Sequence, residues 1–494
     1  MRALAATVAV ALAPFAARAD RVHADATGYL DDRVQWTGLR AGGLVPVADQ
    51  PAFVDLLELN VQLKRTLFSD ATFFYADVSL FGQWGAGFLD GANALRLEPP
   101  AEEPALRPLA VPSELYVSSA PNEHVNLLVG RKRIVWGSGL AWNPTDLLNA
   151  AKDPTDPTFQ RSGAWLARGE AVFEKFTLSA LVAPQVTEQF AGLPRQWTTY
   201  PSWDKRDGDA HFLAATRLYA LVENADVNAI YYFSNAYGED AKARSRGGLS
   251  FSRYFFTDYE LHFEALAQWG TTRQYANAAC FSSPGAAAAC ARSGQSFFAE
   301  TKKDDGAFYP RVLAGTRYLF GDDSQLSVEY LYQADGFTRD ELSTYVAGLL
   351  AARAAAALGV SGAGGMTAGG DASGAASPQK FSFQPLRRHY AFASWSKPQI
   401  HDDWTVTAVV LADLEDLSGL ATASLSWSAQ EWVTLTLSAF APLPGLSTSG
   451  ALVHGGQGLL ETPPRAAGGA DYRATEFGLA PFDYRVLFEA RIFY

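Results

Sequence analysis

Residues 483–494 read DYRVLFEARIFY and alternate between two kinds of side chain. One row carries Tyr484, Val486, Phe488, Ala490, Ile492 and Tyr494, and the other carries Arg485, Glu489 and Arg491. A period of two predicts a β-strand with one apolar and one polar face. Because the apolar row has a tyrosine at each end, the stretch is typical of a strand that crosses a membrane between two aromatic girdles, with its charges facing water.

The same alternation recurs along the chain in segments of roughly ten residues, the length that a tilted strand needs to cross a bilayer. It is clear in residues 57–64, in residues 258–270 (DYELHFEALAQWG), and twice in residues 420–440. A soluble β-sandwich would also alternate, with its apolar rows turned inward. The period therefore predicts an all-β protein but does not by itself decide between a sandwich and a barrel.

The lengths of the connections favour a transmembrane antiparallel up-and-down β-barrel. Short turns are predicted near residues 68–71, 119–122, 174–175, 223–226, 257–258, 321–324, 397–402 and 429–430. The connections between these turns are predicted to be mostly long loops, over 40–52, 85–111, 137–163, 184–208, 237–245, 271–308, 336–385, 414–417 and 443–470. Outer-membrane barrels alternate short periplasmic turns with long extracellular loops, which gives about 18 strands here, with about 16 as the nearest alternative.

A barrel in lipid must close on itself, because no backbone polar group can be left unpaired there. The last strand is therefore expected to pair with the first, near residues 28–39. In that arrangement Arg485, Glu489 and Arg491 project into a wet interior, where a charge costs little.

The first residues, MRALAATVAVALAPFAARAD, have the order of an export signal. Arg2 precedes an apolar run, and Ala17 and Ala19 frame a small-residue cleavage site before Asp20. The sequence thus predicts a signal peptide over residues 1–19 and a single barrel domain over residues 20–494. A disordered alanine-rich tail is the alternative.

Composition agrees with an exported barrel. The chain has 42 Gly, 31 Phe, 20 Tyr and 12 Trp, which suits many strands with aromatic ends, and it has no later run of apolar residues long enough for a membrane helix. Acidic residues outnumber basic ones by 12, which argues against a nucleic-acid partner.

The two cysteines, Cys280 and Cys290, lie in one small-residue loop and are expected to form a disulfide, with two free thiols as the alternative.

The closing strand resembles the C-terminal signal of bacterial outer-membrane β-barrels, since it alternates and ends on an aromatic residue. This resemblance implies the outer membrane of a Gram-negative bacterium as the location. It also implies outer-membrane lipid and the barrel-assembly machinery as partners.

Residues 129–157, VGRKRIVWGSGLAWNPTDLLNAAKDPTDP, form the most distinctive internal stretch. Three consecutive basic residues cannot all face the interior, so a bulge near Gly130 or a position close to the membrane edge is expected. The stretch resembles a segment of large porin-like outer-membrane proteins, including those related to alginate-export barrels. The resemblance covers about 20 residues and implies no particular substrate.

This stretch has two interpretations. A loop that folds inward would carry the constriction candidates Arg131, Lys132, Arg133, Asp146, Asp153 and Asp156, whose charges would make a field across the pore. An ordinary outer loop would use its prolines and aspartates for turns and pair its arginines with Glu170 or other wall acids. A calcium site on the three aspartates is a weaker third interpretation, because no glycine-centred binding loop accompanies them.

Enzyme motifs are scarce: the sequence has no HExxH, CxxCH, G-x-S-x-G or P-loop. His262 lies between Glu260 and Glu264, and Ser250 or Ser252 on the neighbouring expected strand could stand opposite, as in a barrel hydrolase. Any water-filled interior contains the same residue types, so we expect no catalytic residues, no cofactor and no metal.

One long loop contains an expected helix over residues 339–360 and then a glycine-rich tract over residues 361–377. The helix would either plug the pore or lie on the surface.

The expected interior mixes both charge signs. The predicted pore-lining residues are Glu58, Lys64, Arg168, Glu170, Arg217, Glu260, His262, Glu264, Arg311, Arg317, Glu329, Arg485, Glu489 and Arg491. This pattern favours a porin-like channel for passive diffusion of small hydrophilic solutes, either alone or as a homo-oligomer. The alternative is a structural barrel that sheathes or docks a periplasmic partner, such as a multihaem cytochrome or a polysaccharide-export complex.

Overall fold

The structure is a computed structural model. It describes residues 24–39, 53–69, 71–85, 109–149, 152, 163–185, 211–235, 245–271, 275–281, 285–293, 298–299, 306–342, 344–345, 385–443, 476–477 and 482–494.

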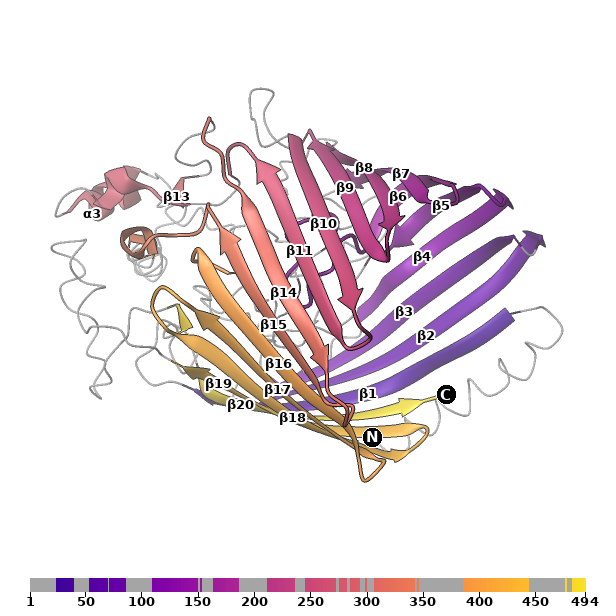
Figure 1. Ribbon diagram of the computed structural model, residues 1–494. Coiled ribbons are helices and arrows are strands. Elements are labelled where there is room, and N and C mark those ends of the chain that lie inside the picture. The colour runs from indigo at the N-terminus through magenta and orange to yellow at the C-terminus, as the bar shows by residue number, and fades with distance from the viewer. Residues whose placement is uncertain are drawn as a thin grey trace.

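The described residues form one 18-stranded antiparallel sheet that closes into a barrel (Figure 1). Its strands are β1 (Ala24–Leu39), β2 (Phe53–Ser69), β3 (Thr72–Gly85), β4 (Leu109–Asn122), β5 (Val125–Lys132), β6 (Ala164–Val172), β7 (Phe176–Gln185), β8 (His211–Val222), β9 (Ala225–Ser234), β10 (Ser245–Phe255), β11 (Tyr259–Gln268), β14 (Arg311–Leu319), β15 (Gln325–Gln333), β16 (His389–Ile400), β17 (Trp404–Asp413), β18 (Gly419–Gln430), β19 (Val433–Leu443) and β20 (Phe482–Phe493). The predicted fold class and strand number are confirmed.

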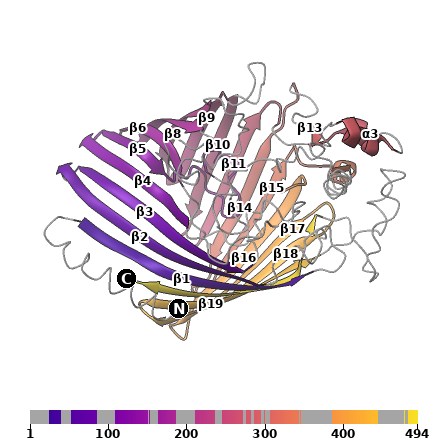
Figure 2. The same ribbon diagram turned by 180° about the vertical axis from the view of Figure 1, so that it is seen from behind.

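The barrel closes between β1 and β20, as the sequence predicts. Each strand pairs with its neighbours in chain order, and β1 pairs with both β2 and β20. Gly28 and Tyr494 exchange two backbone hydrogen bonds, of 3.2 and 3.1 Å. Seen from behind, β1 to β6 lie side by side along one flank (Figure 2).

Short turns and longer connections alternate along most of the barrel, although the connection between β17 and β18 is short, at residues 414–418. Several predicted turn boundaries are wrong by a few residues. The turn between β4 and β5 lies at residues 123–124, that between β8 and β9 at 223–224, that between β16 and β17 at 401–403, and that between β18 and β19 at 431–432. The predictions ended these strands where the alternation of apolar and polar side chains stops. The backbone hydrogen bonds continue beyond that point, as the pairs Asn122–Val125 and Gln430–Val433 show.

The bulge expected at Gly130 is also wrong. β5 keeps one register with both neighbours through this residue and ends two residues later, at Lys132. The basic run therefore lies at a strand end, which was the other expected arrangement.

The two faces of the wall differ in composition. Apolar side chains such as Phe263, Leu437 and Phe488 are 40, 50 and 38% exposed on the outer face. Residues that alternate with them, such as Glu264 and Ser438, are buried on the inner face. The apolar rows therefore do not form a dry interior core, in contrast to a sandwich.

Smaller elements lie in the long connection between β11 and β14. They are β12 (Tyr275–Ala276), η5 (Ala278–Phe281), α3 (Ala286–Ser293) and β13 (Phe298–Ala299), and α3 and β13 lie beside the barrel in Figure 1. A disulfide joins Cys280 to Cys290, with a Cα–Cα distance of 5.7 Å.

The predicted helix over residues 339–360 begins where expected. Residues 339–342 and 344–345 are helical, and Thr338 and Glu341 form a capping box. In it the Thr338 backbone N–H donates to the Glu341 carboxylate over 2.9 Å, and the Glu341 backbone N–H donates to the Thr338 hydroxyl over 3.4 Å. The rest of this helix and the glycine-rich tract lie outside the described residues. Within the part of the chain that the structure describes, no helix has the length and apolar character needed to cross a membrane.

Candidate functional site: a segment inside the barrel

After β5 ends, the chain turns into the barrel instead of continuing along the wall. Residues 133–149, which we call the inner segment, form no regular helix or strand. Its apolar side chains Ile134, Trp136, Leu147 and Leu148 pack against inner-face residues of β6 to β11, including Tyr232. Farther along, Ala141 and Trp142 pack against inner-face residues of β14 to β18. The inner segment is thus fixed to two regions of the wall.

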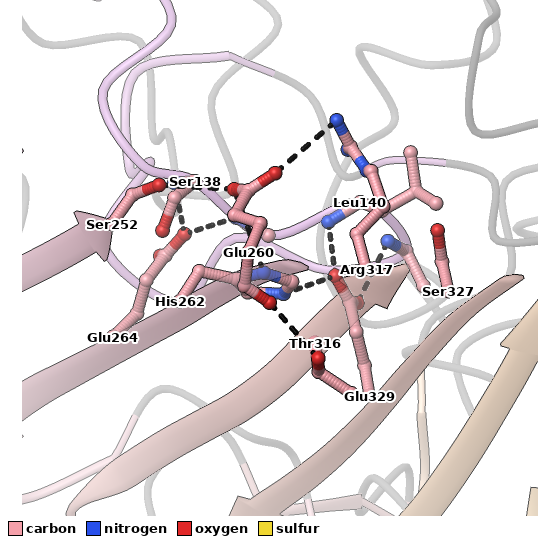
Figure 3. A network of polar contacts seen from close by, with 12 residues as sticks. Ser138, Leu140, Ser252, Glu260, His262, Glu264, Thr316, Arg317, Ser327 and Glu329 are labelled. Atoms are coloured by element: carbon pink, nitrogen blue, oxygen red, sulfur yellow. Dashed lines mark hydrogen bonds and ion pairs between the residues drawn. The ribbon is translucent and has the colours of Figure 1, made fainter. Parts of the chain in front are cut away.

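A single carboxylate, that of Glu264 on β11, holds the first part of the inner segment (Figure 3). It is fully buried and accepts five hydrogen bonds: from the backbone N–H groups of Ser138, Gly139 and Thr145, the Thr145 hydroxyl and the Asn143 amide, over 2.7 to 3.3 Å. Hydrogen bonds from neutral donors to a buried carboxylate are charge-assisted, so this contact is strong. The Glu264 carboxylate accepts hydrogen bonds from backbone N–H groups that, in a regular strand, would donate to backbone oxygens of a neighbouring strand.

Glu329 on β15 holds the next two residues. Its two carboxylate oxygens accept hydrogen bonds from the backbone N–H groups of Leu140 and Ala141, the latter over 2.9 Å. Directly after them, the Trp142 ring lies 5.9 Å from the ring of Tyr390 and 6.1 Å from that of Phe392. The segment therefore reaches from β5 across the interior to β15 and β16.

Two glycines are needed for this path. Gly137 has a φ of +135°, and a Cβ atom there would lie 2.7 Å from a Glu264 carboxylate oxygen. At Gly139 a Cβ atom would lie 2.0 Å from the backbone oxygen of Trp142. The close approach of the backbone to its anchors explains why the sequence has Gly-Ser-Gly here.

The far part of the inner segment has its own contacts. The hydroxyl of Tyr232 on β9 donates to the Thr145 backbone oxygen over 2.7 Å. Asn149 donates from its amide to the Ile134 backbone oxygen over 2.6 Å and to the Asp146 carboxylate over 2.9 Å. Asp146 is therefore engaged inside the segment.

The other constriction candidates are placed as follows. Arg131 is buried, and its Nε–H donates to the Gly163 backbone oxygen over 2.9 Å. Lys132 donates to the Glu114 carboxylate over 3.2 Å and to the Tyr116 hydroxyl over 2.9 Å. The backbone N–H of Arg133 also donates to Glu114. Asp153 and Asp156 lie outside the described residues, and a field across a constriction remains a prediction.

Several predicted pore-lining residues form ion pairs on the inner face of β6 to β15. Arg168 pairs with Glu170 over 3.0 Å, Arg317 with Glu260 over 3.4 Å, and Arg311 with Asp335 over 2.8 Å. Arg217 donates to the Asn228 amide oxygen over 2.7 Å, and its guanidinium lies 5.9 Å from the Trp136 ring.

Other predicted pore-lining residues lie near the seam, the place where β1 and β20 pair and close the barrel. Arg33, which is not among the predicted pore-lining residues, is buried between Asp31, Glu58 and Glu489. Arg491 pairs with Asp31 and Glu489, each over 2.9 Å. Arg485 is buried, and Lys64 is exposed with its ammonium 4.9 Å from the ring of Phe73.

The serines near His262 are not arranged for nucleophilic catalysis. Ser252 faces His262 in the β10–β11 register, but its hydroxyl donates to Glu260 over 2.9 Å. Ser250 accepts a hydrogen bond from the Asn228 amide. The imidazole Nε2 of His262 lies 2.9 Å from Glu329, so histidine and serine are both engaged with carboxylates.

Among the described residues, no group of three or more His, Cys, Asp or Glu side chains has metal-binding geometry. The calcium interpretation stays a prediction, because Asp153 and Asp156 lie outside the described residues; Asp146 accepts a hydrogen bond from the Asn149 amide.

Glu264 and Glu329 are predicted from the sequence as water-facing residues, but in the structure they anchor the inner segment. The apolar inner-face residues that cover this part of the wall were not predicted; they are Leu166, Leu213, Ile230, Tyr232 and Leu266. Apolar residues on the inner face of a wide barrel are a usable signal, because they indicate that protein, not water, covers that part of the wall.

No protein-family description and no curated protein sequence matches this chain. The chain is similar to solved structures over most of its length. OccAB1 of Acinetobacter baumannii is 9% identical with a TM-score of 0.49 over 96% of both chains. An engineered variant of the Rhodopseudomonas blastica porin is 9% identical with a TM-score of 0.39 over 95% of this chain and all of that chain.

Proposed function

We propose that this protein is a porin-like channel of the outer membrane of a Gram-negative bacterium, through which small hydrophilic solutes diffuse passively. The observation that carries the proposal is the inner segment. A closed 18-stranded barrel is wide enough for an aqueous channel, and residues 133–149 narrow it from within without being part of the wall. Fixing such a segment by two buried carboxylates sets the width of the remaining passage.

The outer face supports a location in lipid. Its exposed apolar rows are bordered near the strand ends by aromatic pairs, such as Trp36 with Phe53 and Phe173 with Phe176. Aromatic residues at these two levels are typical of membrane-water interfaces. In this orientation the short turns face the periplasm and the long connections face outward.

The structural alternative, a barrel that sheathes a periplasmic partner, is less well supported. The inner segment crosses from β5 to β15 and occupies interior space that a threaded protein would need. The hydrolase alternative is also less well supported, because Ser252 donates to Glu260 and His262 is engaged with Glu329.

The test is conductance of the purified protein in planar bilayers, with swelling of proteoliposomes in small sugars as a second readout. We expect discrete conductance steps for the wild type. Glu264→Ala removes five hydrogen bonds from the inner segment, so we expect larger and noisier steps. Glu431→Gln, in an exposed turn, is the matched control and should behave like the wild type.

Two outcomes would overturn the proposal. A folded protein that gives a silent bilayer and no swelling would be a plugged or structural barrel. Equal conductance for the wild type and Glu264→Ala would show that the inner segment does not determine the passage.

A further inference from the structure

His262 reaches a carboxylate two strands away. It lies on β11, and its Nε2 atom is 2.9 Å from Glu329 on β15, with β14 between them (Figure 3). The residue of β14 that faces His262 in the register is Gly315, which also faces Glu329. A Cβ atom at Gly315 would lie 2.2 Å from the imidazole Nε2 and 2.8 Å from the Glu329 Cγ. The missing side chain therefore makes the contact possible.

The contact acts on the inner segment through Glu329. The same carboxylate oxygen that lies next to His262 accepts the backbone N–H of Leu140, and the other oxygen accepts that of Ala141. His262 is 3% exposed and Glu329 is 1% exposed, so water does not compete for these bonds. The imidazole thus orients the carboxylate that holds the segment.

The charged groups around the imidazole are mostly acidic. On β11, Glu260 lies 3.8 Å from the Nδ1 atom of His262, and Glu264 is the next inner-face residue. Arg317 on β14 pairs with Glu260 over 3.4 Å. From the inner segment side, Lys152 donates to the backbone oxygens of Gly139 and Leu140. β10 contributes the neutral Ser252, which donates to Glu260.

We propose that His262 is a positioning residue for the inner segment, and that protonation of its imidazole tightens the hold of Glu329 on Leu140 and Ala141. A neutral imidazole that donates from Nε2 leaves Nδ1 as an acceptor beside the Glu260 carboxylate. An imidazolium makes the hydrogen bond from Nε2 to Glu329 charge-assisted, and it directs its second N–H toward the Glu260 carboxylate, 3.8 Å from Nδ1, as an ion pair. Its positive charge also offsets the excess of carboxylates. The effect on transport rests on the proposed function, but the effect on the segment does not.

The first test is amide hydrogen exchange of residues 138–141 in detergent-solubilised protein, at pH 5.5 and pH 8 and corrected for intrinsic exchange rates. For the wild type we expect about tenfold stronger protection at the lower pH, the order of change expected when the His262–Glu329 hydrogen bond becomes charge-assisted. His262→Gln keeps a polar side chain but does not titrate, so its protection should not change between the two pH values.

Gly315→Ala tests the geometry independently. The methyl group displaces the imidazole, so this variant should also lose the pH effect. Gly247→Ala on β10 is its matched control, because a Cβ atom there has no neighbour within 4 Å. His401→Gln, in an exposed turn, is the control for His262→Gln. Both controls should retain the wild-type pH dependence.

The proposal is overturned if His262→Gln keeps the pH effect or if the wild type has none. If one variant does not fold, Glu329→Gln provides the same comparison, because it removes the charge that binds the imidazolium. The second test is conductance in planar bilayers at the same two pH values. If the inner segment is held more tightly at pH 5.5, the wild-type currents should be steadier at that pH. Silent bilayers together with pH-dependent protection would refute the channel and leave the positioning role intact.

Discussion

Arg491 and Asp31 form an ion pair of 2.9 Å that joins the last strand of the barrel to the first. Asp31 is fully buried and also contacts Arg33, which in turn pairs with Glu489 of the last strand over 3.4 Å. Arg491 and Glu489 of the closing strand thus meet complementary charges on β1 and on each other. The inner row of the seam adds ionic contacts to the backbone pairing that closes the cylinder.

Removing Arg33 should weaken this seam. Arg33→Met keeps the length of the side chain but leaves Glu58 without its guanidinium partner, and breaking a buried ion pair costs about 3–5 kcal/mol. We expect the folded, heat-modifiable form to unfold at lower urea concentration in lipid vesicles. Arg65→Met, at an exposed position on β2, is the control. Equal midpoints for the two variants would mean that backbone pairing alone holds the seam.

Neighbouring residues of β19 should differ in how much the same substitution destabilises the barrel. Leu437 is 50% exposed on the outer face, whereas Thr436 is on the inner face, 3.0 Å from the Ser426 hydroxyl. Leu437→Arg places a charge in hydrocarbon and should cost about 2–4 kcal/mol, whereas Thr436→Arg should cost much less. The free energy of unfolding into vesicles measures both. A larger cost for Thr436→Arg would exclude the assignment of the outer face to lipid.

Glu476, in the connection between β19 and β20, should make local stability depend on pH. Burial raises the pKa of this carboxyl from 4.5 to about 7, and the charge of Asp416 adds to the effect, whereas hydrogen bonds from Tyr390 and the Leu386 backbone N–H oppose it. Between pH 4.5 and 7 the folded form holds a proton that the unfolded form has lost. The local free energy of unfolding therefore falls as pH rises through this window and is constant above it.

Hydrogen exchange of residues 476–477 at several pH values checks this expectation. Glu476→Gln should remove the slope between pH 4.5 and 7, whereas Glu123→Gln, an exposed carboxyl in a turn, should keep it. A wild-type protein with rising protection over the same window would have an ionised, stabilising Glu476 instead.

The fold could be predicted from the sequence because it depends on local patterns. Alternation in residues 258–270 assigns Phe263 to the outer face and Glu264 to the inner face, and the structure agrees. Turn positions are less certain, since backbone pairs such as Asn122–Val125 form regardless of which side chains they carry.

The site could be predicted only in part. The sequence marks residues 129–157 as unusual, but it does not distinguish Glu260, which pairs with an arginine, from Glu264, which holds the inner segment. That difference arises from contacts between residues 119 to 126 positions apart and from the register that places Gly315 beside His262. Neither these long-range contacts nor this strand register can be recognised from the local sequence.

The anchors of the inner segment come from strands made of much later residues. Thr145 binds a carboxylate that follows it by 119 residues, and Ala141 binds one that follows it by 188. Residues 133–149 can take their final path only when β11 and β15, which carry Glu264 and Glu329, are both in place. The interior of the barrel and its wall therefore complete each other, although their residues lie far apart in the chain.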